Sequence, residues 1–167
     1  ALEFNPAVVC IADETYYRPL CEALSDLPIR VLAGEKALAE MVTMPAIDVV
    51  VAAMVGYAGL RPTIEAIKAK KTIALANKET LVVAGEIIDR LAKRNKVDIL
   101  PVDSEHSAIF PSLVGESRDS IEKLLLTASG GPFRTFTYEQ MQHVTAAQAL
   151  QHPNWEMGAK ITIDSAS

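Results

Sequence analysis

Short apolar runs alternate with segments of helical spacing through most of this chain. The runs occupy residues 7–12, 29–32, 48–53, 72–75 and 98–102. They are largely apolar without interruption and contain many β-branched residues, which is typical of strands buried on both faces of a parallel sheet. Alternation of such strands with helices predicts right-handed crossover connections and helices on both faces of the sheet. We therefore expect the runs that end beside Asp13, Ala53 and Asn77 to be parallel neighbours in one sheet.

Helical spacing fills the intervals between these runs. We expect helices at residues 13–24, 35–44, 62–70, 78–94 and 104–114, and two shorter ones around 138–141 and 145–151. The pattern changes after Val102, where two further strands are expected at 121–128 and 160–164. The second of these has the alternating polarity of a half-covered sheet. We place a domain boundary here, which separates residues 1–102 from residues 103–167.

Composition and charge exclude several classes of partner. The chain has 167 residues, a net charge of −5 and a pI of about 5.2, so nothing favours nucleic acid or an anionic membrane surface. The longest apolar stretch, residues 49–60, is too short to span a bilayer and contains two glycines. The two cysteines, Cys10 and Cys21, lie in apolar or helical surroundings and are expected to be buried reduced thiols, which fits a reducing compartment.

Two carboxylates follow the run at residues 98–102. Residues i and i+2 of an extended chain project to the same side, so Asp103 and Glu105 can converge beyond the carboxyl end of the strand, where open α/β sheets bind their ligands. Two carboxylates in one small volume repel each other, and a hard cation such as Mg²⁺ or Mn²⁺ compensates for this. The alternative is that Asp103 caps a helix and Glu105 lies in its first turn. His106 is then a residue of the helix start.

Asn77, Lys78 and Glu79 follow the preceding run, at the same carboxyl edge of the expected sheet. Asn77 can cap the helix that starts there. Lys78 in the first helical turn opposes the helix dipole and is a poor choice for stability. A lysine beside two carboxylates and a helix N-terminus indicates a polar ligand.

Three later segments have weaker signals. Ser129 precedes two glycines, a pattern that can bring backbone N–H groups close to an anion or can simply form a turn. The stretch from His152 to Gly158 contains Trp155 and Met157 between Pro and Gly, as expected for a loop that closes over a pocket or for one pinned to the core by its Trp. Ser165 follows the last expected strand and can donate to an anion or cap.

Taken together, these segments resemble the 1-deoxy-D-xylulose 5-phosphate reductoisomerase family. The matching blocks agree in order and spacing along essentially the whole chain. They are Leu-Ala-Asn-Lys-Glu at 75–79, Pro-Val-Asp-Ser-Glu-His at 101–106 with Ala-Ile-Phe at 108–110, Ser-Gly-Gly-Pro-Phe at 129–133, His-Pro-Asn-Trp at 152–155 with Met-Gly at 157–158, and Lys-Ile to Asp-Ser-Ala at 160–166.

The resemblance implies a role for each matching residue. Asp103 and Glu105 are implied to hold the metal, Ser104 and Glu105 to touch the substrate, and Lys78 to contact its reacting oxygens, so Lys78, Asp103 and Glu105 are the expected catalytic residues. The loop carrying Trp155 and Met157 is implied to close over the substrate, with Gly158 near the nicotinamide. Cofactor contacts are expected from Asn77, Glu79, Met157 and Gly158, and further substrate contacts from Ser129, His152, Trp155 and Ser165, with the two serines at the phosphate.

The fold implied by the resemblance is α/β. It is a Rossmann-like parallel sheet without its N-terminal βαβ unit (residues 1–102), followed by the start of an α+β catalytic domain (residues 103–167). The family's Gly-rich dinucleotide fingerprint is expected before this stretch, and its Asn-Lys-Gly-x-Glu segment and C-terminal helical domain after it. The chain is thus expected to be the middle of such an enzyme and inactive when isolated.

The whole enzyme is implied to convert 1-deoxy-D-xylulose 5-phosphate to 2-C-methyl-D-erythritol 4-phosphate in non-mevalonate isoprenoid biosynthesis. It is implied to use NADPH with Mg²⁺ or Mn²⁺ and to act as a homodimer in the bacterial cytoplasm or the plastid stroma. The expected partner is the small sugar phosphate, with no nucleic acid and no membrane. The alternative from another class is a non-catalytic α/β module that binds a divalent ion or phosphate.

Overall fold

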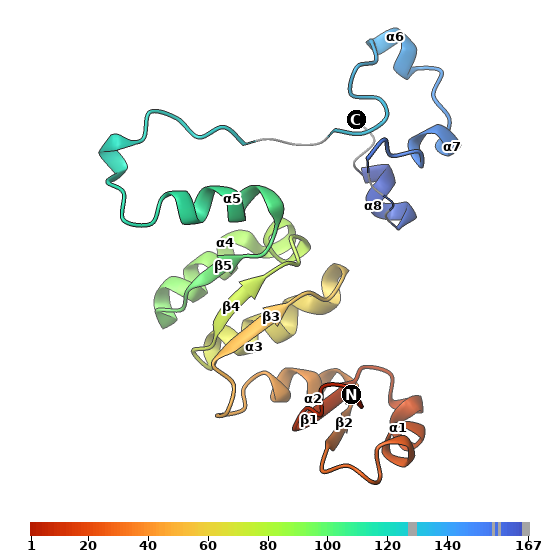
Figure 1. Cartoon of the computed structure of the whole chain (residues 1–167), viewed down its shortest axis with the longest axis vertical. Helices are drawn as coiled ribbons and strands as arrows, with labels where there is room; N and C mark the ends of the chain where they lie inside the picture. Colours follow the sequence, from red (N-terminus) through yellow and green to blue (C-terminus); the bar gives the residue numbers. More distant parts are fainter. Residues whose placement is uncertain (127–129, 155, 157, 165–167) are drawn as a thin grey trace. The chain divides into compact units, whose positions relative to one another are not determined.

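The computed structural model describes residues 1–126, 130–154, 156 and 158–164. The chain divides into two compact units, Ala1–Pro111 and Ser112–Ser167 (Figure 1). The first unit contains every strand of the described part of the chain. The domain boundary expected at residue 102 stays a prediction. No helix in the described part of the chain has the length and apolarity needed to cross a membrane.

The first unit alternates strands and helices as the sequence predicts. All five apolar runs form strands, and every pair of neighbouring strands is parallel. Its elements in chain order are β1 (Val8–Ile11), η1 (Glu14–Tyr16), α1 (Tyr17–Ala23), β2 (Arg30–Ala33), α2 (Gly34–Met41), β3 (Val49–Ala52), η2 (Gly56–Gly59), α3 (Leu60–Lys68), β4 (Thr72–Leu75), α4 (Glu79–Asn95), β5 (Ile99–Pro101) and α5 (Ser104–Ser112).

The strands form two sheets rather than the single sheet expected from the sequence. β1 pairs with β2, and β3, β4 and β5 form a separate sheet in that order. The prediction that the runs before Asp13, Ala53 and Asn77 are neighbours in one sheet is therefore wrong for the first of them. No described strand pairs with members of both sheets, so backbone hydrogen bonds between strands do not join them. They are connected instead by α2, which contacts β1, β2 and α3.

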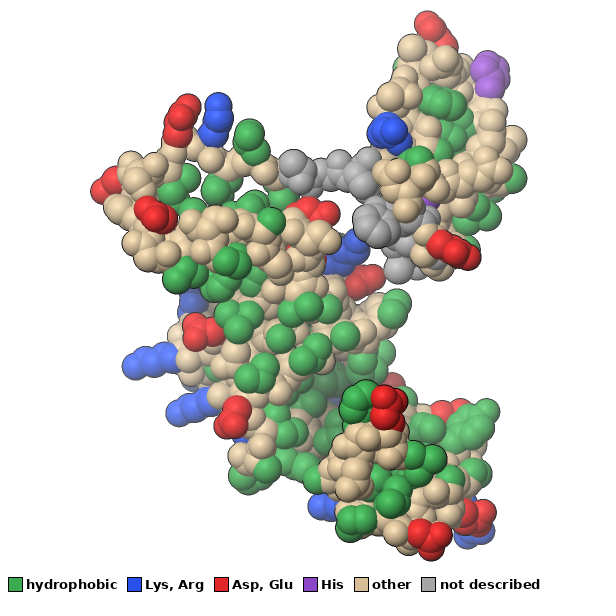
Figure 2. All heavy atoms as spheres, in the orientation of Figure 1, with side chains coloured by type: hydrophobic (Ala, Val, Ile, Leu, Met, Phe, Trp, Pro, Cys, Tyr) green, Lys and Arg blue, Asp and Glu red, His purple; other side chains and the backbone are tan. Residues whose placement is uncertain are grey.

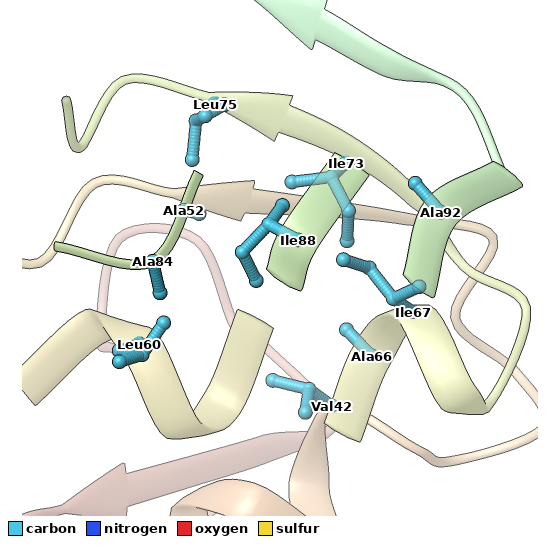
Figure 3. Packing of buried hydrophobic residues seen from close by; sticks show 10 residues of the cluster. All are labelled: Val42, Ala52, Leu60, Ala66, Ile67, Ile73, Leu75, Ala84, Ile88 and Ala92. Carbon is cyan, nitrogen blue, oxygen red and sulfur yellow. The ribbon is translucent and has the colours of Figure 1, made fainter. Parts of the chain in front are cut away.

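The main core lies on one face of the β3–β4–β5 sheet. Side chains from the strands meet those of α3 and α4 there, and Val42 at the end of α2 joins them (Figure 3). The buried members of this core are Val42, Ala52, Leu60, Ala66, Ile67, Ile73, Leu75, Ala84, Ile88 and Ala92. Burying large aliphatic side chains is the dominant stabilising contribution in a layer of this kind.

The opposite face of this sheet is exposed at β3. Val49 and Val51 of β3 are 51% and 65% exposed, and hydrophobic side chains are visible on the surface of this unit (Figure 2). The expectation of burial on both faces is thus wrong for β3, because α3 and α4 pack on the same face of the sheet. Fully parallel sheets normally have both faces covered.

The second unit is built from short helices. Its described elements are η3 (Arg118–Ser120), α6 (Tyr138–Met141), α7 (Ala146–Ala149) and α8 (Ala159–Asp164). Thr137 and Thr145 each begin a helix with a capping box, in which the threonine and a glutamine three residues later satisfy each other's backbone N–H groups. A small core of Phe133 and Ala149 holds α6 and α7 together, with Met141 and Val144 packed against it.

Two strand predictions fail in this unit. Residues 121–126 form no strand, and residues 160–164 lie in α8 instead of the expected strand. A strand needs a neighbour to satisfy its backbone groups, and the described part of this unit offers none. A helix satisfies the same groups within its own segment.

The core of the first unit can be tested with two adjacent isoleucines of α4. Ile88 is fully buried, whereas Ile87 is 56% exposed. We expect Ile88→Ala to lower the free energy of unfolding by about 2–5 kcal/mol, because it removes buried methyl groups and leaves a cavity. The matched control Ile87→Ala should change it by less than about 1 kcal/mol. Urea denaturation followed by circular dichroism measures both, and equal losses would contradict the packing described above.

Candidate functional site at the carboxyl edge of the β3–β4–β5 sheet

Three strands of the first unit end at one edge. Ala52 of β3 is in register with Leu75 of β4, which is in register with Pro101 of β5. The pairing continues one step beyond the strands, since the Val102 N–H donates to the Leu75 carbonyl at 3.0 Å. The carboxyl ends of parallel strands are where open α/β sheets bind their ligands. The segments that follow β4 and β5 are therefore brought to this edge together, as the sequence predicts.

Asn77 caps α4 with a buried side chain. It is 4% exposed, and its Oδ1 accepts from the Thr80 backbone N–H at 2.9 Å and from the Thr80 hydroxyl at 3.2 Å. Its Nδ2 donates to the carbonyl oxygens of Met54 and Gly56 in the segment after β3. The capping role that the sequence left open is confirmed, and the cofactor contact stays a prediction.

Lys78 and Glu79 start α4 directly after this cap. Lys78 is exposed, and Glu79 is partly exposed in the first turn. The N-terminus of a helix carries a partial positive charge, which favours Glu79 and disfavours Lys78. The position of Lys78 thus costs stability, and it places an ammonium group where an anionic or oxygen-rich ligand can reach it.

Asp103 caps the next helix, α5. Its Oδ1 accepts from the His106 backbone N–H at 2.6 Å, and its Oδ2 lies 2.8 Å from His106 Nδ1. The Ser107 hydroxyl donates to the Pro101 carbonyl at 2.9 Å and so ties the first turn to the end of β5. The expectation that His106 belongs to the helix start is confirmed.

The geometric argument that linked Asp103 to Glu105 needs correction. It assumed an extended chain through residues 103–105, but β5 ends at Pro101 and α5 begins at Ser104. Glu105 therefore lies in the first turn of a helix, and strand alternation does not bring the two carboxylates together. What they share is the N-terminus of α5, whose partial positive charge favours both. Their role as metal ligands stays a prediction.

The pKa of the Asp103 carboxyl lies below its ordinary value. Desolvation raises this pKa, but the hydrogen bonds from the backbone and ring of His106, the charge of that ring and the backbone N–H of Glu105 together outweigh it. The anionic form is therefore the favoured one at this helix end.

The donor set of this edge fits a hard cation incompletely. No group of three or more Cys, His, Asp or Glu side chains within the described ranges is placed to hold a metal ion. Mg²⁺, however, needs one or two carboxylates and takes its other ligands from substrate and water. The Asp103 side chain is 36% exposed. A carboxylate has about four lone-pair positions. On Asp103, His106 uses two of them and the Glu105 backbone N–H bonds to the same carboxyl, which leaves about one position for a cation.

The remaining predicted site residues lie in different parts of the chain. Ser104 is exposed in the first turn of α5, beside Glu105. His152 and Gly158 belong to the second unit, where the half-buried His152 accepts at Nδ1 from the Asn154 N–H at 3.2 Å. Four predicted residues lie outside the described part of the chain: Ser129, Trp155, Met157 and Ser165.

The segment between β3 and α3 lies at the same edge, although no site residue was predicted there. Val55 and Tyr57 are 75% and 73% exposed, and Gly56 has a positive φ of 71°. The available signal was a pair of glycines, Gly56 and Gly59, directly after the strongest predicted strand. Glycine at such a position permits a turn that other residues resist.

The lowered pKa of Asp103 predicts how the start of α5 responds to acid. A carboxyl whose pKa is lower in the folded state stabilises the fold above its unfolded pKa of about 4. This contribution is lost as the pH falls through the lower, folded value. We expect the His106 amide resonance to titrate with a midpoint below about pH 4, and the shift to be absent in Asp103→Asn. NMR titration measures this, and a midpoint above the ordinary value would contradict the hydrogen-bonded cap.

Comparison with known proteins gives a consistent result along the chain. The family model of 1-deoxy-D-xylulose 5-phosphate reductoisomerase matches residues 1–85, and that of the 1-deoxy-D-xylulose 5-phosphate reductoisomerase C-terminal domain matches residues 99–167. The reductoisomerase of Bacteroides thetaiotaomicron is 65% identical over 167 residues, which are 100% of this chain and 43% of that protein. The one of Clostridium perfringens is 54% identical and is matched over 99% of this chain and 44% of its own length.

Solved structures agree with these sequences. A DOX-P reductoisomerase crystallised with NADPH, fosmidomycin and magnesium superposes with a TM-score of 0.82 at 42% identity, over 99% of this chain and 43% of that one. The Zymomonas mobilis enzyme in complex with NADPH gives a TM-score of 0.85 at 44% identity, over 97% of this chain and 41% of that one. This chain spans less than half the length of these relatives. Because the first family model alone matches residues 1–85 of its 167 residues, the chain belongs to the 1-deoxy-D-xylulose 5-phosphate reductoisomerase family.

Proposed function

We propose that this chain forms the central part of an enzyme that converts 1-deoxy-D-xylulose 5-phosphate to 2-C-methyl-D-erythritol 4-phosphate with NADPH and Mg²⁺ or Mn²⁺. The reaction is an isomerisation of the ketose phosphate followed by delivery of a hydride from NADPH. Family membership supports the proposal, as do relatives solved with NADPH, fosmidomycin and magnesium.

The observation that carries the proposal is the meeting of two helix starts at one sheet edge. Lys78 immediately precedes α4 after β4, and Asp103 and Glu105 lie at the start of α5 after the neighbouring parallel strand β5. An ammonium group and two carboxylates there can serve a substrate with adjacent carbonyl and hydroxyl oxygens. Lys78 contacts these oxygens, and Ser104 and Glu105 orient the substrate beside them.

A divalent ion, when bound by Asp103 and Glu105, supplies Lewis-acid polarisation of the substrate oxygens. The chain's own residues then have distinct tasks. Asp103 and Glu105 place their side chains at the N-terminus of α5, and the hydrogen bonds from His106 hold the Asp103 carboxylate in place. Lys78 provides a fixed positive charge and a hydrogen-bond donor toward the reacting centre.

Residues of the second half of the chain serve the substrate's phosphate and the cofactor in this proposal. The phosphate is remote from the reacting carbons, so its binding energy orients the reaction centre. A closing loop with Trp155 and Met157 excludes water. Substrate contacts come from Ser129, His152, Trp155 and Ser165, with the two serines at the phosphate. Cofactor contacts come from Met157 and Gly158 in this half and from Asn77 and Glu79 at the start of α4.

The proposal extends to assembly and location. We place the full-length enzyme in the bacterial cytoplasm as a homodimer, acting on a soluble sugar phosphate. The bacterial origin of the matching relatives supports the location. Analytical ultracentrifugation of the full-length protein measures the assembly.

Asp103→Asn in the full-length enzyme separates a metal ligand from a helix cap. Asparagine keeps the shape and caps a helix about as well as aspartate, but it removes one charge from the proposed metal site. We expect kcat/KM to fall at least about 100-fold at low metal concentration, since even residues behind the ligands cost about 10–100-fold. High Mn²⁺ should recover part of the activity.

Asp98→Asn is the matched control, because exposed Asp98 immediately precedes β5, at the opposite end of the strand from Asp103. It should leave the metal requirement unchanged. Steady-state assays over a range of Mg²⁺ and Mn²⁺ concentrations measure both variants. Normal turnover of Asp103→Asn with an unchanged metal requirement would contradict the proposal that Asp103 binds the metal.

We also expect the 167-residue chain alone to be inactive. It spans 43% of a relative's length and contains no G-x-x-G-x-x-G pattern to place the cofactor's pyrophosphate at a helix N-terminus. The loss of NADPH absorbance with substrate and Mn²⁺ measures this. Oxidation above a blank without enzyme would contradict the expectation.

A further inference from the structure

The Asn77 side chain uses its whole hydrogen-bonding capacity inside the protein. An asparagine amide offers two N–H donors and two acceptor lone pairs. Both donors point at carbonyl oxygens of the segment after β3, those of Met54 and Gly56, and both lone pairs accept from Thr80 in α4. With 4% of the residue exposed, no donor or acceptor of this amide remains for a ligand.

These bonds join two neighbouring segments of the candidate site. One is the β3–α3 segment with the exposed Val55 and Tyr57, and the other is the start of α4 with Lys78. The backbone N–H of Asn77 also donates to the Ala52 carbonyl at 2.8 Å, which is the end of β3. Asn77 therefore fixes the β3–α3 segment against the turn that displays Lys78.

Gly59 lies directly against the Asn77 amide. A Cβ on Gly59 would lie 2.7 Å from Asn77 Nδ2, closer than side chains tolerate. Its φ of −75° is accessible to any residue, so the glycine is required here for space and not for backbone freedom. The Gly59 carbonyl is held in turn by the Thr63 hydroxyl at 2.8 Å.

We propose that Asn77 is a positioning residue, whose buried amide fixes the β3–α3 segment and Lys78 in one geometry, and that any cofactor contact of Asn77 comes from its main chain and not from its amide. This assignment rests on the proposed function for its catalytic consequence. The structural part, a clasp between the two segments in the free protein, stands independently of it.

Hydrogen–deuterium exchange of the free chain tests the clasp. Asn77→Ser keeps an oxygen that can cap α4 but removes both donors to Met54 and Gly56. We expect amide exchange over residues 54–59 to rise by about tenfold, as the loss of buried hydrogen bonds predicts. Asn95→Ser is the matched control, because Asn95 at the other end of α4 donates to the Leu91 carbonyl at 2.8 Å. It should leave residues 54–59 unchanged.

Gly59→Ala disturbs the clasp from the other side and keeps the Asn77 side chain. It should reproduce the rise in exchange over residues 54–59, and it decides the question if Asn77→Ser does not fold. Unchanged exchange over residues 54–59 in either folded variant overturns the clasp. A direct contact between the Asn77 amide and the cofactor predicts that outcome, because the variants would then differ from the parent only when NADPH is bound.

Kinetics of the full-length enzyme test the catalytic consequence. We expect Asn77→Ser and Gly59→Ala each to lower kcat/KM for NADPH by about tenfold, with a lower kcat as well as a higher KM, because the clasp holds both the cofactor-contacting neighbours and Lys78 in place. The apparent affinity for Mn²⁺ should not change. A loss in Asn77→Ser without one in Gly59→Ala, or a rise in KM with kcat unchanged in both variants, overturns the positioning role. If the unaltered enzyme shows no turnover, the proposed function fails, and the exchange experiment still decides the clasp.

Discussion

The parallel pairing of β3, β4 and β5 determines where the functional groups of this chain can meet. Its register places Ala52, Leu75 and Pro101 side by side, so the three segments that follow begin at one edge. The core beneath the sheet holds α3 and α4 against it and fixes the direction in which each helix leaves. Changing the register by one residue would turn the strand side chains over and break that core. The site thus depends on packing several residues away from it.

Stability and chemistry make compatible demands at one helix start and conflicting demands at the other. At α5 they agree, because carboxylates at a helix N-terminus are favoured by the helix dipole and Asp103 also serves as the cap. At α4 they conflict, because Lys78 occupies the turn where a positive charge is disfavoured by about 0.3–1 kcal/mol. The cap by Asn77 and the acidic Glu79 offset this locally. A residue whose position costs stability is a better indicator of function than one that improves it.

The sequence predicted best where local pattern and tertiary environment agree. Residues 72–75 form β4 as expected, because a short apolar run between turn signals is buried most readily as a strand inside a sheet. It failed where the outcome depends on a neighbouring strand: residues 160–164 have strand-like alternation but form α8. The same dependence separated β1 from β3, since strand order is a property of partners and not of the run itself. At the candidate site, the sequence correctly placed Lys78 and Asp103 after neighbouring strands of one sheet, but it assumed an extended chain where a helix begins.

Capping and ligand binding are often treated as alternatives for residues such as Asn77 and Asp103. Counting the hydrogen bonds of each side chain gives a different answer for the two residues. Both side chains cap a helix. The Asp103 carboxylate accepts from His106 and from the Glu105 backbone N–H, and with about four lone-pair positions and 36% exposure it keeps room for a cation, so it can cap and bind a cation together. The Asn77 amide is 4% exposed, with both donors and both acceptors engaged. A capping carboxylate can therefore be a ligand as well, whereas a saturated, buried amide acts through the segments that it joins.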